Sequence, residues 1–208
     1  VYVTLALALL VVSPSLGPLA SGMLGGAAHA VGTLIEGVQR FFAPGEIAPL
    51  FTREVARWRG EIVRWAEAYE LDPNLLATVM QIESCGHPTV VSVAGAQGLF
   101  QVMPFHFAPG EVMQDPETNA RRGAAFLREC QTWASGDAGR AMACYNGGPS
   151  VLSRDYSAWP AETQRYYQWG RGIYADAQRN AQSSETLASW LDAGGARLCA
   201  MAAAQLGL

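Results

Sequence analysis

Glu83 is the side chain in this sequence best placed for acid–base chemistry. It follows Leu76, Val79 and Met80 at helical spacing, so it lies on an apolar face, and Gly86 places it in the last turn of that helix. Both an apolar environment and the partial negative charge of a helix C-terminus oppose ionisation of a carboxyl group. A raised pKa is what a general acid working near neutral pH requires. A glutamate that turns toward water is the alternative, and position alone favours it.

Two segments downstream of Glu83 have the composition expected of a carbohydrate-binding groove. Residues 95–104 combine small residues with two amide side chains and a thioether. Small residues let a bulky ligand approach the backbone, and amides hydrogen-bond hydroxyl and acetamido groups in both directions. Residues 145–149 again place an amide and bare backbone beside an aromatic ring. This combination suits a sugar ring.

A second carboxylate opposite Glu83, which most glycosidases use, is not evident in the sequence. Helix caps, turns and the helix dipole account for the other acidic residues considered, which are Glu111, Asp115, Glu117, Asp155 and Glu162. The three histidines are not spaced as a set of metal ligands, and they are His29, His87 and His106. We therefore expect no metal and no cofactor.

The spacing of apolar residues predicts a mostly α fold that positions these groups. A stripe of apolar and aromatic residues predicts one helix across residues 51–69. Asp-Pro pairs, typical of helix starts, open a helix at residue 73, which carries Glu83, and another at residue 116. Residues 87–98 are β-branched and Gly-rich, and we expect a short strand or an irregular loop there. Further helices are expected across residues 141–145, from about residue 160 to residue 177, and as a pair within residues 181–208.

Composition and the N-terminal segment point to an exported protein with one sizeable domain. The chain has 208 residues, half of them hydrophobic, and a net charge of −4 with no basic cluster that would bind nucleic acid. Residues 1–12 are apolar but too few to cross a bilayer, which takes roughly 20 residues. They fit the apolar core of a signal peptide, with a cleavage-like site at residues 28–30, and an uncleaved membrane anchor is the alternative.

The four cysteines, Cys85, Cys130, Cys144 and Cys199, match no zinc-binding spacing. An even number of cysteines in an exported protein suggests disulfides. Two helices joined by a turn near residue 137 would bring Cys130 and Cys144 together, while Cys85 competes as a partner for either. Small buried thiols are the remaining alternative.

Several blocks of residues resemble the catalytic domain of the soluble lytic transglycosylases, which has an α+β, lysozyme-like fold. The blocks keep the order and spacing of that family across residues 70–178 and comprise Glu83 and Ser84, Ser92 with residues 95–104, Asn119 with Gly123 and Leu127, residues 143–149, and Glu162 and Thr163 with Tyr166. The resemblance implies a helical domain with at most a small β element or irregular loop beside the groove. It divides the chain into a signal peptide or membrane anchor plus linker at residues 1–45, a catalytic domain at residues 46–180 and a helical tail at residues 181–208.

The resemblance also implies an activity and roles for single residues. It assigns Glu83 as the acid, then the base, of a peptidoglycan lytic transglycosylase, which cleaves the β-1,4 bond between N-acetylmuramic acid (MurNAc) and N-acetylglucosamine (GlcNAc) and forms a 1,6-anhydromuramoyl product. In the same family pattern, Ser92 orients the reacting sugar, Tyr166 faces Glu83, and Met103 shapes the subsite. The groove is lined by Gln101, Tyr145 and Asn146.

Three places depart from the family pattern, namely Cys85, Cys144 and residues 105–107, and they put the width of the groove in question. The expected partner is the glycan strand of peptidoglycan, and we expect the protein to be a monomer. If residues 1–12 stay uncleaved, they would attach the protein to a membrane. Two alternatives remain open. One is a goose-type-like hydrolase that delivers water, and the other is a non-catalytic module that binds the cell wall.

Overall fold

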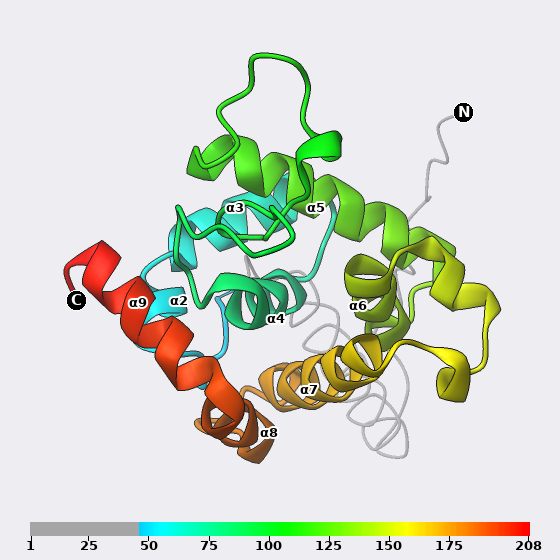
Figure 1. Ribbon diagram of the computed structural model, residues 1–208. Helices are drawn as coiled ribbons and strands as arrows, with labels where there is room; N and C mark the ends of the chain where they lie inside the picture. Colours follow the sequence, from blue (N-terminus) through cyan, green and yellow to red (C-terminus); the bar gives the residue numbers. More distant parts are fainter. Residues whose placement is uncertain (1–45) are drawn as a thin grey trace, which may run out of the picture. The chain divides into compact units, whose positions relative to one another are not determined.

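A computed structural model describes residues 46–208 of the chain (Figure 1). The predictions for residues 1–45, including the signal peptide or anchor and the linker, lie outside the described residues. Within residues 46–208, no helix combines the length and apolar character that crossing a bilayer requires.

Helix α4, Pro73–Ser84, carries Glu83 near its C-terminal end and lies among the other long helices (Figure 1). The Asp72 carboxylate caps its N-terminus by accepting hydrogen bonds from the backbone N–H groups of Asn74 at 2.7 Å and of Leu75 at 3.3 Å. The helix ends where Cys85 adopts a left-handed φ of 50°. Its apolar face is fully buried, at about 1.5–3 kcal/mol for each side chain, and consists of Leu75, Leu76, Val79 and Met80.

The remaining helices surround α4 and confirm the mostly α prediction. Helices α3 and α7 pack against α4, while α6 packs between α5 and α7. Two isolated β-bridges, Val91 with Gln97 and Gln97 with Val102, make the small β element expected beside the groove. The bounds of these surrounding helices are α2, Arg53–Ala56; α3, Arg59–Ala68; α5, Pro116–Trp133; α6, Ala138–Gly147; and α7, Ala161–Gln178. Short 3₁₀ turns occupy Pro104–His106, Pro149–Ser153 and Tyr156–Ala158.

The prediction of one helix across residues 51–69 was wrong, because α2 and α3 are separate helices with a break at Arg57 and Trp58. The backbone N–H of Trp58 bonds three residues back, to the Val55 carbonyl at 2.9 Å, and its indole N–H donates to the Gly86 carbonyl at 2.9 Å. The indole hydrogen bond connects the break between α2 and α3 to the turn that follows α4. The apolar stripe is nevertheless buried as expected, at Phe51, Val55, Ile62 and Trp65.

The C-terminal segment forms two helices, as predicted. Helix α8, Glu185–Trp190, continues through a π-helical turn, Leu191–Gly195, into α9, Ala196–Leu206. The direction changes at Gly194, whose φ of 124° a residue with a side chain rarely adopts. Helix α9 packs on α2 and α4, so the segment joins the same core as the acid-bearing helix (Figure 1).

Two disulfides resolve the cysteine pairing that the sequence left open. Cys130 and Cys144 join α5 to α6, as the helical hairpin predicts. Cys85, at the end of α4, is bonded to Cys199 on α9. The second bond fastens the C-terminal segment to the residue that follows Glu83 and Ser84.

Candidate active site

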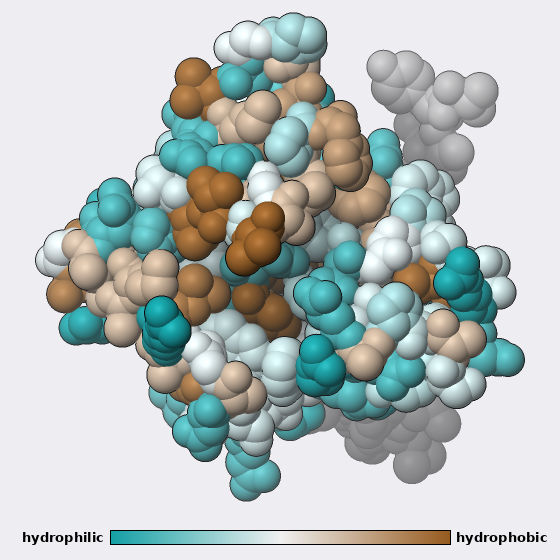
Figure 2. Space-filling model, viewed as in Figure 1, coloured by the Kyte–Doolittle hydropathy of each residue, from teal (hydrophilic) through white to brown (hydrophobic). Residues whose placement is uncertain are grey.

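A cavity of about 390 Å³ opens beside Glu83. Apolar side chains gather over the loop that follows α4, beside the hollow in the middle of this face (Figure 2), and Val91 and Val93 are exposed apolar residues of that loop. Four helices and the π-helical turn supply the cavity wall. Its lining residues are Ile82, Glu83, Asn146, Glu162, Arg165, Tyr166, Trp169, Trp190 and Ala193.

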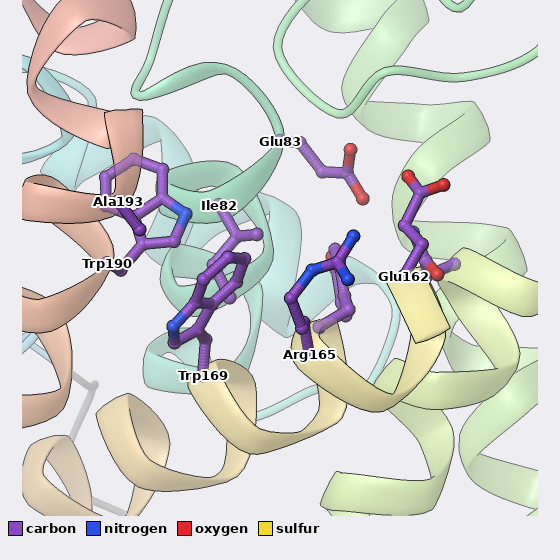
Figure 3. Close-up of a pocket in the computed structure, with 9 residues that line it drawn as sticks. Ile82, Glu83, Glu162, Arg165, Trp169, Trp190 and Ala193 are labelled. Carbon is purple, nitrogen blue, oxygen red and sulfur yellow. The ribbon is translucent and has the colours of Figure 1, made fainter. Parts of the chain in front are cut away.

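Glu83 is half-buried, and its carboxyl group points into this cavity (Figure 3). Burial raises the pKa of Glu83 from 4.5 to about 8, the nearby Tyr166 hydroxyl lowers it in part, and the negative charge of Glu162 raises it further. Glu83 is therefore protonated near neutral pH. The sequence prediction gave the direction of this pKa correctly, with burial as its main cause.

Two tyrosines, the buried Tyr166 and the partly buried Tyr145, lie close enough to Glu83 for its charge to affect their pKa values. Burial raises the pKa of both Tyr145 and Tyr166 well above the ordinary value, and the Glu83 carboxylate adds to the rise. The Tyr166 hydroxyl is buried and has no hydrogen-bond partner among the described residues. It is therefore a protonated donor held beside Glu83. The Tyr145 hydroxyl instead donates to the Phe100 carbonyl at 2.7 Å.

The loop beside Glu83 is held by side chains from helices α4 and α5. The Ser84 hydroxyl donates to the Leu99 carbonyl at 2.6 Å, which fixes the loop to the end of α4. Asn119 on α5 accepts from the Phe100 N–H at 2.9 Å and donates to the Gln97 carbonyl at 2.7 Å. A Cβ at Gly123 would lie 2.6 Å from the Phe100 Cβ, so only glycine allows this approach. Sequence reasoning placed Ser84, Asn119 and Gly123 in family blocks without a role, and this support is their role in the structure.

A second, smaller cavity of about 40 Å³ contains three of the predicted groove residues, Gln101, Met103 and Tyr145, together with His106 and Phe126. The Gln101 amide N–H group is already used, because it donates to the Val90 carbonyl at 3.1 Å and the Gly98 carbonyl at 3.0 Å. Its amide oxygen is the atom left for a ligand.

Asn146 and Tyr166 lie in the Glu83 cavity, as expected of groove residues, whereas Ser92 lines neither cavity. The Asn146 side-chain oxygen accepts a hydrogen bond from the Thr163 hydroxyl at 2.9 Å, which orients its amide. The Ser92 hydroxyl accepts from the Ala96 N–H at 3.0 Å within the loop. Its contact with a sugar stays a prediction.

The expectation that no second carboxylate stands near Glu83 was wrong for Glu162. Glu162 is in the first turn of α7, as predicted, but its side chain projects into the cavity toward Glu83 (Figure 3). The sequence could not reveal this because it depends on how α7 packs against α4.

Three of the other carboxylates that were considered, Glu111, Asp115 and Glu117, have the structural roles expected of caps and ion pairs. Asp115 caps α5 by accepting from the Thr118 N–H at 2.9 Å. Glu117 pairs with Arg64 and accepts from the Trp65 indole at 2.8 Å. Hydrogen bonds from Arg122 are the main reason why the pKa of Glu111 is lowered to about 2.

Three side chains in the described part of the chain are close enough together to hold a metal ion, namely Glu54, Cys85 and Cys199. The two sulfur atoms form a disulfide, so neither is a thiolate that could bind the metal.

The packing of helices around an acid-bearing central helix, with a groove loop at its C-terminal end, defines a mostly α, lysozyme-like domain. The transglycosylase SLT domain family matches residues 61–169, and the chain belongs to this family.

Known relatives match the central part of the chain. A transglycosylase of Enterobacteria phage PRD1 is 38% identical over 112 residues, which are 53% of this chain and 40% of the relative. An endo-type membrane-bound lytic murein transglycosylase A of Klebsiella pneumoniae is 31% identical over 88 residues, 36% of this chain and 43% of the relative. The chain thus spans less than half the length of these relatives.

One solved structure shares the fold. It is an inactive variant of the lytic transglycosylase Slt from Pseudomonas aeruginosa, which is 24% identical with a TM-score of 0.50. The match covers 60% of this chain and 25% of that one.

The cavity also contains residues that sequence reasoning missed. Arg165 and Trp169 follow Glu162 on α7, and Trp190 and Ala193 come from the C-terminal segment, beyond the family match at residues 61–169. Arg165 and Trp169 lie on the same face of α7 as Glu162, so the packing of α7 against α4 brings them into the cavity as well. Nothing in the sequence near Trp190 indicates that it lies beside Glu83.

Proposed function

We propose that the protein is a peptidoglycan lytic transglycosylase that cleaves the β-1,4 bond between MurNAc and GlcNAc. The observation that carries the proposal is Glu83, protonated near neutral pH in a cavity with aromatic and amide walls. A general acid must hold a proton at working pH and release it to the leaving group. Membership of the SLT domain family supports the same reaction.

In the proposed reaction, Glu83 first donates its proton to the glycosidic oxygen as the bond from the muramoyl C1 breaks. The 2-acetamido group stabilises the positive charge that develops at C1. The ionised Glu83 then takes the proton of the muramoyl C6 hydroxyl, whose oxygen attacks C1 and closes the 1,6-anhydro ring. The acid is regenerated and no water is consumed. Since the attack is intramolecular, orientation replaces an activated water.

Within this proposal, each predicted groove residue has the role that the family resemblance implies. Tyr166 donates a hydrogen bond to Glu83 when Glu83 is ionised, and Asn146 contacts the sugar in the same cavity. Gln101, Met103 and Tyr145 bind the strand in the neighbouring cavity, and Ser92 orients the reacting sugar from the loop edge.

We also propose that the protein works outside the cytoplasm, on peptidoglycan in the cell envelope. Two disulfides among residues 85–199 support an oxidising compartment. Attachment to a membrane through residues 1–12 and the monomeric state belong to the same proposal.

A hydrolase is the second candidate, and Glu162 is the observation that favours it. A second carboxylate in the cavity could activate water, which would replace the C6 hydroxyl as the attacking group. Transglycosylation needs only Glu83, so Glu162 would then act through the pKa of Glu83.

Mass spectrometry of the products from purified peptidoglycan separates these functions. We expect muropeptides one water lighter than hydrolysis products, formed by the wild type and by Glu162→Gln, and none from Glu83→Gln. Hydrated products that disappear in Glu162→Gln would establish the hydrolase. A wild type that binds peptidoglycan but releases no products would establish a binding module.

A further inference from the structure

The cavity beside Glu83 has one cationic side chain in its lining, Arg165. Arg165 is exposed on α7, and its guanidinium group points into the part of the cavity that the carboxyl groups of Glu83 and Glu162 also face (Figure 3). Glu162 is three residues earlier on the same helix, a spacing that permits an ion pair. Arg165 nevertheless forms no ion pair with any carboxylate in the described part of the chain, and it differs from the other unpaired arginines there in lining the cavity of Glu83.

The charged side chains that line the cavity favour binding of one anion at one position. When Glu83 is protonated, Glu162 and Arg165 supply one negative and one positive charge. A ligand carboxylate next to Glu162 would be repelled. The favourable position is therefore on the other side of Arg165, toward Trp169, which follows four residues later on α7 and lines the same cavity. Three residues of helix separate Glu162 from Arg165 by roughly 4.5 Å along the axis, which is enough to distinguish the two sides.

We propose that Arg165 binds a carboxylate carried by the muramoyl residue of the glycan strand. The inference rests on the proposed function, because it takes peptidoglycan as the ligand. The strand alternates GlcNAc, which is uncharged, with MurNAc, which carries a lactyl substituent. The lactyl group ends in a free carboxylate or is joined to a stem peptide that carries one. A guanidinium group donates two parallel hydrogen bonds to a carboxylate, which an uncharged sugar cannot accept in that geometry.

This contact would set the register of the strand. The two sugars have the same ring and the same 2-acetamido group, so walls that bind the ring alone hold both at each subsite. Moving the strand by one sugar would place the other type of linkage beside Glu83. A charge that recognises only MurNAc fixes which linkage Glu83 protonates. Arg165 is thus a specificity-determining residue in contact with substrate.

The test is binding by the full chain carrying Glu83→Gln, so that no probe is cleaved. Isothermal titration measures Kd for chitotetraose, for a GlcNAc-MurNAc tetrasaccharide with free lactyl carboxylates, for its lactyl methylamide and for a stem-peptide form. Adding Arg165→Gln should weaken binding of the free carboxylate form about fivefold, the size expected of a partly exposed charge pair. Chitotetraose and the methylamide should change less than twofold. A loss confined to the stem-peptide form would place the recognised carboxylate on the peptide and also support the proposal.

Two control variants make the result specific. Arg171→Gln removes the same charge from an exposed site on α7 outside the cavity and should leave every Kd unchanged. Arg165→Lys keeps the charge without the forked geometry and should recover part of the affinity. The preference for the anionic probe should also weaken at high salt.

Equal effects of Arg165→Gln on charged and uncharged probes, or no effect on any, would overturn the proposal. With Glu83 intact, a displaced pH profile of cleavage in Arg165→Gln would also overturn it, since Arg165 would then act through Glu83. The proposed function is judged separately by the products of the wild type. If the wild type released no anhydro products, the proposed function would be wrong, but the preference of the protein for probes with a free carboxylate could still be measured.

Discussion

Replacing Glu83 by Gln should make the protein more stable, and increasingly so as the pH rises. In the unfolded chain the carboxyl group ionises near pH 4.5, whereas in the folded protein its pKa is about 8. Between these values the unfolded state loses a proton that the folded state keeps, so the free energy of unfolding falls as pH rises. The loss is about 1.4 kcal/mol for each pH unit and reaches roughly 4 kcal/mol at pH 8. Gln fills the same volume without this cost.

Urea unfolding of the wild type and Glu83→Gln at pH 4, 6 and 8 measures the effect. The two proteins should differ little at pH 4, by roughly 2 kcal/mol at pH 6 and by roughly 4 kcal/mol at pH 8. Glu67→Gln, on the exposed side of α3, is the matched control, and its difference from the wild type should not change with pH in this way. Parallel stability curves for the wild type and Glu83→Gln across this range would refute the assignment of a protonated Glu83.

Two further predictions concern the surroundings of Glu83. Cleavage should decline as the pH rises through about 8, and Glu162→Gln should move this decline to lower pH, because the removed charge no longer favours the protonated form of Glu83; an unmoved pH–rate profile would contradict the role of Glu162. Removing the Cys85–Cys199 disulfide, which bridges 114 residues, should cost about 5 kcal/mol of unfolding free energy, against about 3 kcal/mol for Cys130–Cys144, which bridges 14. Thermal and urea unfolding of Ser pairs check this order, and a larger loss from the shorter bridge would count against it.

Local sequence signals predicted the helix that carries the acid. Asp72 and Pro73 fixed the start of α4, and the apolar residues that follow identified its buried face. The same reasoning joined α2 and α3, because an apolar stripe at helical spacing continues across their break. At the break, the Trp58 indole donates to the Gly86 carbonyl, a tertiary contact that periodicity does not record.

The candidate site was predictable only where its residues stand within family blocks. Glu83, Asn146 and Tyr166 were expected in one groove, and the structure places all three in the same cavity. Trp190 and Ala193 were not expected, because they reach the cavity through the packing of α8 on α7 and the bond from Cys85 to Cys199. A turn or cap signal in the sequence, such as the one at Glu162, predicts how the backbone groups are hydrogen-bonded. It does not predict which groups the side chain faces.

A single carboxyl group that serves first as acid and then as base must be able to adopt both its protonated and its ionised form during the reaction. Different neighbours of Glu83 favour each of these two forms. Burial and the charge of Glu162 favour the protonated acid in the free protein. The Tyr166 hydroxyl favours the ionised base, because a buried donor with no other partner in the described chain gains a strong acceptor when Glu83 loses its proton. Because this hydrogen bond strengthens as the proton leaves, it stabilises the transition state of proton transfer more than the protonated ground state, and it is also why Tyr166 lowers the pKa of Glu83 in part. In the proposed reaction, Tyr166 therefore compensates for the environment that keeps Glu83 protonated.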